Sequence, residues 1–144
     1  MKHIKTGKEI RFSNDKPKMY DKCEEKFGIV WGATTFAYDW TIHSWGKPSP
    51  DIIRHEVVHF LQQDREGGAD KWWNRYLDDE EFRYRQELEA YAVQAMFTNK
   101  RNIFEYTKVL QKMYGINKGT NTIYSELLIM YKSINKKDYE LEQD

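Results

Sequence analysis

Apolar side chains recur at helical spacing through most of the chain after residue 50. This pattern predicts four helices, over about residues 50 to 64, 79 to 98, 103 to 114 and 121 to 134. Ser49 is expected to cap the first helix with its hydroxyl, and Pro50 suits the first helical position because no amide donor is needed there. Asp78 or Asp79 is expected to cap the second helix.

The first third of the chain has a mixed pattern. Residues 17 to 27 predict a short helix that ends at Gly28. Residues 29 to 45 are rich in β-branched and aromatic residues and predict two short strands joined near Gly32. Residues 69 to 77 stay unassigned. The outline is an α+β fold, in which a small β-region and then helices form one domain over residues 1 to 135, followed by a polar, frayed tail at residues 136 to 144.

The pattern of chemical interest is His55-Glu56-Val57-Val58-His59, which falls within the helix predicted to begin after Ser49. Two imidazoles four residues apart lie on one face of a helix and can bind the same metal ion, while the intervening Glu can reach a metal-bound water. The apolar stripe of this helix is complete without either histidine, so neither is needed for the core. The stripe is Ile53, Val57, Phe60 and Leu61, and the face with the histidines also carries Ile52 and Gln63. The alternative is a surface helix on which the pattern arose by chance.

A zinc ion needs a third protein ligand. The metzincin extension, with Gly and then a third His, is excluded because Gln62 and Arg65 occupy those positions. A carboxylate from the second long helix is the other known solution, and that helix offers Glu87 and Glu89. Glu87 lies nearer the centre of the helix face expected to point inward, so we favour it over Glu89. The inward face is marked by Tyr84, Leu88, Tyr91, Ala92 and Ala95.

On these residues the chain resembles the gluzincin-type zinc metallopeptidases, including small prokaryotic and phage zincin-like proteins. In that family HExxH lies on one helix, and the third ligand is a Glu on a following helix, often within E-x-x-A-D or E-A-x-x-D. The match at residues 55 to 59 is complete, and Glu87-Leu88-Glu89-Ala90-Tyr91 matches the second pattern in part, with Tyr91 where the family often has Asp. The resemblance covers about residues 34 to 95. It implies a zincin-like fold, and it implies that the strand region at residues 34 to 45 pairs with an extended substrate.

The resulting hypothesis is a zinc peptidase in which His55, His59 and Glu87 bind Zn²⁺. Glu56 would act as the general base on the zinc-bound water, and the substrate would be a peptide or protein. The donor that stabilises the oxyanion stays open among Tyr84, Tyr91, Tyr124, His43 and Arg85. The alternative is a catalytically inert zincin-fold protein whose metal is structural and whose function is protein binding.

Composition narrows the partners and the compartment. The 23 basic residues cancel the 23 acidic ones, so net charge favours neither nucleic acid nor an anionic membrane surface as a partner. The single Cys23 excludes a disulfide framework and a thiolate zinc site, and the polar N-terminus does not resemble a signal peptide. We therefore expect a cytoplasmic protein. The oligomeric state stays open.

Overall fold

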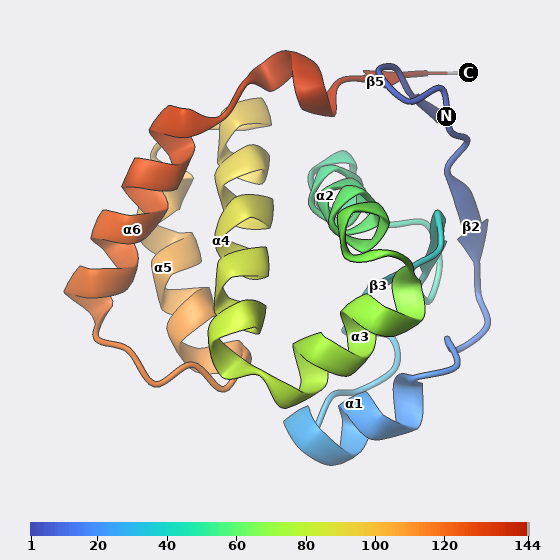
Figure 1. Cartoon of the computed structure of the whole chain (residues 1–144), viewed down its shortest axis with the longest axis horizontal. Coiled ribbons are helices and arrows are strands. Elements are labelled where there is room, and N and C mark those ends of the chain that lie inside the picture. The colour runs from blue at the N-terminus through green and yellow to red at the C-terminus, as the bar shows by residue number, and fades with distance from the viewer. Residues whose placement is uncertain (144) are drawn as a thin grey trace.

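The secondary structure alternates short strands and helices in the first third and is helical thereafter. The computed structural model describes residues 1 to 143 and has an α+β fold (Figure 1). The strands are β1 (Lys2–His3), β2 (Arg11–Ser13), β3 (Phe36–Tyr38), β4 (Thr41–His43) and β5 (Leu141–Glu142). The helices are α1 (Tyr20–Phe27), α2 (Pro50–Glu66), α3 (Ala69–Asp78), α4 (Glu80–Phe97), α5 (Asn102–Met113), α6 (Thr120–Ser133) and the 3₁₀ helix η1 (Lys136–Tyr139).

The helix ends follow from the capping residues. The Ser49 hydroxyl accepts a hydrogen bond from the Ile52 amide, and Pro50 begins α2, as predicted. Gly67 ends α2 in the left-handed conformation, with φ of 95°, which glycine adopts without steric cost. Asp79 caps α4 by accepting a hydrogen bond from the Phe82 amide. The four predicted helices are therefore confirmed, with ends shifted by one or two residues.

The prediction for the strands is wrong at the turn. The two strands are β3 and β4, and they are joined at Asp39 and Trp40 rather than near Gly32. Both turn residues have positive φ, 48° and 63°, a conformation that suits a two-residue hairpin but is unfavourable for a large side chain. Packing offsets this cost, because the buried Trp40 ring stacks on Phe60 with the ring centroids 5.0 Å apart. Tertiary contacts of Trp40 therefore set the position of the turn.

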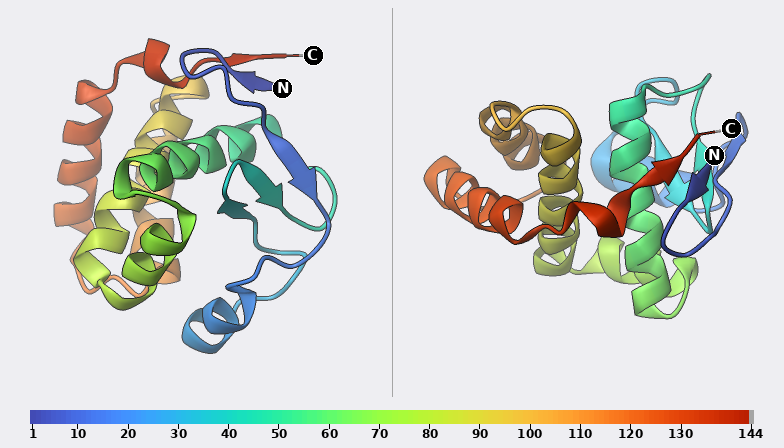
Figure 2. Two further views of the ribbon diagram at one scale, coloured as in Figure 1. Left: turned by 45° about the vertical axis from the view of Figure 1, so that its right-hand side comes forward. Right: turned by 90° about the horizontal axis from the view of Figure 1, so that it is seen from above.

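Helix α2 lies between a sheet and a helical layer (Figures 1 and 2). The three-stranded sheet, in the order β2-β4-β3, packs on one side of α2 through a cluster that includes Trp40, Ile42, Ile53, Val57 and Phe60. On the other side stand α4, α5 and α6, which share a core formed by the predicted inward face of α4. A third cluster joins α1, β3 and α3. This arrangement places the polar face of α2 opposite α4.

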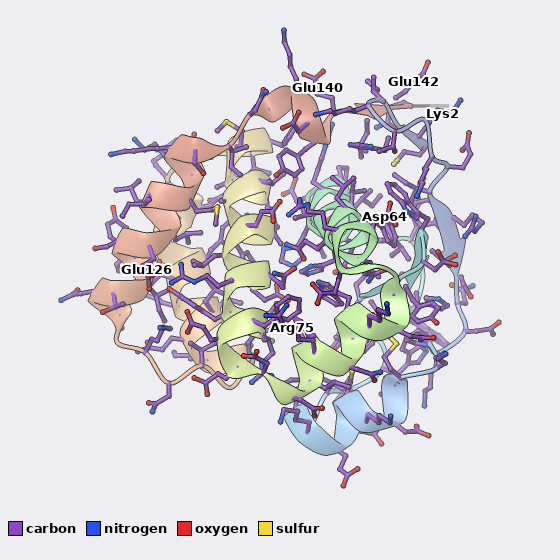
Figure 3. The ribbon with its side chains drawn as sticks, viewed as in Figure 1. Lys2, Asp64, Arg75, Glu126, Glu140 and Glu142 are labelled. Atoms are coloured by element: carbon purple, nitrogen blue, oxygen red, sulfur yellow. The ribbon has the colours of Figure 1, made fainter. Side chains whose placement is uncertain are left out.

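Two segments differ from expectation. Residues 69 to 77, which the sequence left unassigned, form α3 together with Asp78. The expectation of a frayed tail is wrong for residues 136 to 143, where η1 is followed by β5, which pairs with β1. Figure 3 shows Lys2, Glu140 and Glu142 gathered where the two ends of the chain meet. Tyr139 is buried in this segment, which explains why polar composition alone was misleading.

Across residues 1 to 143, none of the helices combines the length and the apolar character that a membrane crossing requires.

Candidate metal centre

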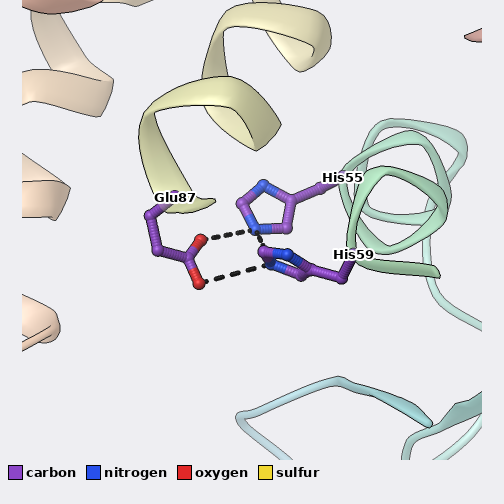
Figure 4. Close-up of side chains that lie close together, drawn as sticks. All are labelled: His55, His59 and Glu87. Carbon is purple, nitrogen blue, oxygen red and sulfur yellow. Dashed lines mark hydrogen bonds and ion pairs between the residues drawn. The ribbon is translucent and has the colours of Figure 1, made fainter. Parts of the chain in front are cut away.

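The two histidines of α2 and one glutamate of α4 converge in the interior (Figure 4). His55 and His59 lie one turn apart on α2, and their Nε2 atoms are 3.2 Å apart. The carboxylate of Glu87 reaches across from α4, with Oε1 3.0 Å from Nε2 of His55 and Oε2 3.3 Å from Nε2 of His59. All three side chains are buried, and their ligand atoms lie within 4.8 Å of one another. The group is therefore one that could hold a metal ion.

The spacing of these atoms fits a tetrahedral ion. Zinc holds imidazole nitrogens about 2.0 Å away, which places neighbouring ligand atoms of a tetrahedron about 3.3 Å apart. The two Nε2 atoms, 3.2 Å apart, lie close to that edge length, and each faces a different oxygen of Glu87, at 3.0 and 3.3 Å. Two imidazoles and one carboxylate form a common donor set for zinc that leaves a fourth position open.

A glutamine amide fixes the tautomer of His59. The Nε2 of Gln62 donates both to the backbone oxygen of Gln86, at 2.9 Å, and to Oε1 of Glu89, at 3.2 Å. The amide oxygen of Gln62 is thereby left to face Nδ1 of His59, at 2.8 Å, and must accept a proton from it. With the proton on Nδ1, the Nε2 lone pair points at the other ligands, as metal binding requires.

The other two residues of the group, His55 and Glu87, are held in a similar way. Nδ1 of His55 lies 3.0 Å from the amide oxygen of Gln94, which accepts its proton. The Tyr76 hydroxyl donates to Oε2 of Glu87 at 2.6 Å. The Tyr91 ring packs against His55 with the ring centroids 4.4 Å apart. The three side chains that could bind a metal are therefore held in place by their protein neighbours.

Without a metal, the charges in this group strongly shift the pKa values. Burial lowers the pKa of His59, but the Glu87 carboxylate outweighs this and raises the pKa to about 9. Burial raises the pKa of Glu87, but the two histidines outweigh this and hold it well below its usual range. A proton on His59 thus neutralises part of the group when no metal is present.

Glu56 stands beside this group on a cavity of about 260 Å³. The same cavity is lined by His55, His59 and Glu87, and by aromatic rings from three helices and from β3. Burial raises the pKa of Glu56 to about 7, although the two histidines partly offset the effect. Among the described residues, no hydrogen bond reaches the Glu56 carboxylate. Its oxygens are thus left to a ligand or to water in the cavity.

Glu89, the alternative third ligand, does not belong to the group formed by His55, His59 and Glu87. Its carboxylate accepts two hydrogen bonds from Arg65, at 3.0 and 2.7 Å, and one from the Tyr139 hydroxyl at 2.7 Å. With the bond from Gln62, both Glu89 oxygens are occupied. The geometry therefore places Glu87, and not Glu89, with the two histidines.

Only part of the strand region at residues 34 to 45, which we expected to pair with an extended substrate, borders the cavity. The outer edge of β3 is closed, because the Ala37 oxygen accepts hydrogen bonds from Nε2 of Gln63, at 2.7 Å, and from Nε1 of Trp73, at 2.9 Å. The Asp39 amide donates to Oε1 of the same Gln63. We expected Gln63 to face the metal with the histidines, but it binds the sheet instead. Of this region, only residues 34 to 36 line the cavity, together with the preceding Ala33.

One of the five candidate oxyanion donors, Tyr91, lines the cavity. Tyr84 and Arg85 instead bind Glu126, His43 binds the backbone of Asp15, and Tyr124 lies on α6. Trp72 and Trp73 are buried in the core and also line the cavity.

Several residues of the site were missed from the sequence. Tyr114 lines the cavity, and its hydroxyl lies 2.6 Å from that of Tyr91. The spacing of Gln62 and Gln94 could have indicated their role. Gln62 follows His59 by three residues and Gln94 follows Glu87 by seven, and both spacings place the two side chains on the same face of a helix. Tyr76 and Tyr114 have no such signal, since they come from a segment left unassigned and from the end of another helix.

Comparisons with known proteins add no relative: neither a protein-family model, nor a curated protein, nor a solved structure matches this chain.

Adjacent glutamines of α2 allow a matched test of ligand positioning. Gln62→Met should weaken zinc binding by about 10- to 100-fold, because His59 loses the acceptor that fixes its tautomer. Gln63→Met should leave the zinc Kd within about twofold, because that amide binds only the sheet. Both variants should lose about 1 to 3 kcal/mol of unfolding free energy. Chelator competition and urea denaturation measure the two quantities, and equal zinc affinities would contradict the assignment.

Ionisation of Glu89 should make the free energy of unfolding depend on pH in the acid range. Burial raises its pKa, but the hydrogen bonds from Arg65 outweigh this and hold the pKa below its ordinary value. Its contribution to stability is therefore present above about pH 4.3, the unfolded-state value, and is lost as the pH falls through the lower folded-state pKa. Glu89→Gln should be less stable than wild type at pH 7, and the difference should shrink towards pH 3. Urea denaturation at pH 7, 5, 4 and 3 measures this, and a constant difference would contradict it.

Proposed function

We propose that this protein is a zinc-dependent peptidase, with zinc held by His55, His59 and Glu87 and with Glu56 as general base. The observation that carries the proposal is that three buried acceptor groups, with ligand atoms within 4.8 Å of one another, converge beside a cavity onto which Glu56 also opens. The resemblance of residues 55 to 59 and of Glu87 to the gluzincin motifs supports the same assignment and a zincin-like arrangement.

The open side of the group favours catalysis over a purely structural metal. Structural zinc sites are normally closed by four protein ligands. Within the described residues, three ligands come together and the cavity borders them. A structural site would also have no use for Glu56, a buried carboxylate that receives no hydrogen bond from the described residues. These features support a hydrolase over an inert binding module.

In the proposed reaction zinc acts as a Lewis acid that makes water a nucleophile near neutral pH. Glu56 accepts the proton of the attacking water and passes it to the leaving amine. Gln62 and Gln94 keep the two imidazoles in the binding tautomer, and the Tyr76 hydroxyl orients Glu87. Tyr91 and Tyr114 line the cavity, and their hydroxyls lie 2.6 Å apart, so one proton is shared between them and the other is the donor we assign to the developing oxyanion.

The lining of the cavity supports an internal peptide bond beside a large apolar side chain as the substrate. Exopeptidases need a charged group to bind the free terminus of the substrate. In the described chain, no Lys, Arg or Asp lines the cavity, and its two carboxylates are already assigned to zinc binding and proton transfer. The remaining walls are mostly aromatic and aliphatic, including Phe27, Ile29, Phe36, Trp72 and Trp73.

The substrate backbone is proposed to lie along residues 33 to 35, just before β3. Thr34 and Thr35 line the cavity, whereas the edge of β3 itself is closed at Ala37 by Gln63 and Trp73. Pairing with an extended peptide would therefore be short and would leave much of the selectivity to the apolar cavity.

The role of Glu56 is tested by Glu56→Gln. The variant should keep stoichiometric zinc, because Glu56 is not a ligand, and should lose about 10²- to 10⁴-fold in kcat/KM, because the general base is gone. Metal analysis and hydrolysis of casein and of blocked fluorogenic peptides measure both. Glu66→Gln, on the same helix but outside the cavity, is the control and should keep wild-type activity. Zinc-loaded wild type without hydrolysis would favour the binding module, and wild type without zinc would exclude both functions.

The substrate class is tested at the rim of the cavity. Ile52 lines the cavity and is 38% exposed, so Ile52→Asp should fold normally while placing a charge where an apolar side chain would enter. We expect wild type to prefer blocked peptides with a central Phe over those with Ala, Asp or Lys, and the variant to lose about 10-fold or more on the Phe peptide. Ile129→Asp, at a residue 68% exposed on α6, is the matched control. Equal cleavage of the Phe and Asp peptides by wild type would exclude this class.

A further inference from the structure

A chain of hydrogen bonds leads away from the metal ligands on the side that does not line the cavity. It begins at His59, whose Nδ1 donates to Gln62, and continues from Gln62 to Glu89 on α4. Neither Gln62 nor Glu89 lines the cavity. Because the other proton of the Gln62 amide is donated to the Gln86 oxygen, α4 determines how that amide is turned. The orientation of His59 therefore depends on where Glu89 stands.

Glu89 is in turn held by groups from two other segments. Arg65 of α2 binds both of its oxygens, and the Tyr139 hydroxyl donates to Oε2 at 2.7 Å. The Arg65 side chain is more than half exposed, whereas Tyr139 is buried. The Tyr139 bond is thus the one shielded from solvent, where a hydrogen bond to a charged group is strongest.

Tyr139 is itself fixed by several contacts of the C-terminal segment. Its ring packs against Val58 of α2 and Val93 of α4, between the two helices that carry the ligands. Its backbone oxygen accepts a hydrogen bond from Nη1 of Arg54, and the preceding Asp138 oxygen accepts one from His3. Pairing of β5 with β1 continues this attachment to the N-terminal end of the chain.

We propose that Tyr139 is a positioning residue for the metal ligand His59 and acts through Glu89 and Gln62. The packing of the C-terminal segment against α2 and α4 thereby sets the affinity for zinc. The inference needs a metal at the site but does not depend on peptide hydrolysis. Removing the Tyr139 hydroxyl leaves the hydrogen bonds between Arg65 and Glu89 in place, so the zinc affinity should fall only in part. The Gln62 amide is then held less firmly and presents its oxygen to His59 for less of the time.

The test compares Tyr139→Phe with Tyr84→Phe by measuring the zinc Kd of the full chain in competition with a chelator. Tyr84 is the matched control, because it is also a buried tyrosine that donates to a glutamate, Glu126, and among the described residues this hydrogen bond does not lead to His59. We expect Tyr139→Phe to raise the zinc Kd by about 3- to 10-fold, less than the loss of the Gln62 contact itself. Tyr84→Phe should leave the Kd unchanged, although urea denaturation should show a similar loss of stability in both.

A double-mutant cycle tests the route. In the Gln62→Met background, Tyr139→Phe should have no further effect on the zinc Kd, because the connection is already broken. Equal Kd values for Tyr139→Phe and wild type, or the same change in Tyr139→Phe and Tyr84→Phe, would overturn the proposal. An undiminished effect of Tyr139→Phe in the Gln62→Met background would also overturn it. Failure of hydrolysis with normal zinc binding would affect only the proposed peptidase.

Discussion

Two imidazole lone pairs and a carboxylate face one another in the protein interior, and none of the three can donate a proton while the histidines are neutral. Such a group is repulsive unless a cation lies within it, because burial removes the water that would otherwise screen it. The cation is either a proton, which the raised pKa of His59 allows, or a metal ion that prefers tetrahedral coordination. The surrounding structure is arranged to hold these three side chains together despite that cost.

Apart from Glu56, whose carboxylate opens on the cavity, the polar side chains around the group are held by hydrogen bonds. In the described part of the chain, every fully buried side-chain nitrogen and oxygen has a partner. Arg83 contributes to this from α4, since its guanidinium donates to the backbone oxygens of Tyr76 and Tyr114 at 2.7 Å each. Those two tyrosines turn their side chains toward the ligand Glu87 and the cavity. One buried cation thereby sets the backbone from which both hydroxyls approach the site.

What could be predicted from the sequence was whatever is local to one helix. The apolar stripe of α2, the Ser49 cap and the i, i+4 spacing of His55 and His59 are properties of a single segment, and the structure confirms them. Glu87 needed one further step, the facing of α4. Glu87 does lie with the two histidines, but the face marked as inward packs against α5 and α6 rather than α2, so the facing argument rested on the wrong face. The turn at Asp39 and Trp40 was missed because the contact between Trp40 and Phe60 is long-range. The burial of Tyr139 was missed for the same reason, since its partners lie on α2 and α4 while its own neighbours in sequence are polar.

The apolar and polar contacts of the α2–α4 pair lie on different sides of the pair, which explains how the fold tolerates the buried polar group. On one side Val58, Ala90, Val93 and the Tyr139 ring form an apolar contact that needs no metal. The sheet and the α5–α6 pair hold α2 and α4 from outside through their own clusters. The helices therefore stay together whether the polar side holds a proton or a metal, and binding of a metal exchanges one cation for another within a fold that already exists. A centre of this kind differs from a small zinc-stabilised domain, in which the free energy of metal binding is the free energy of folding.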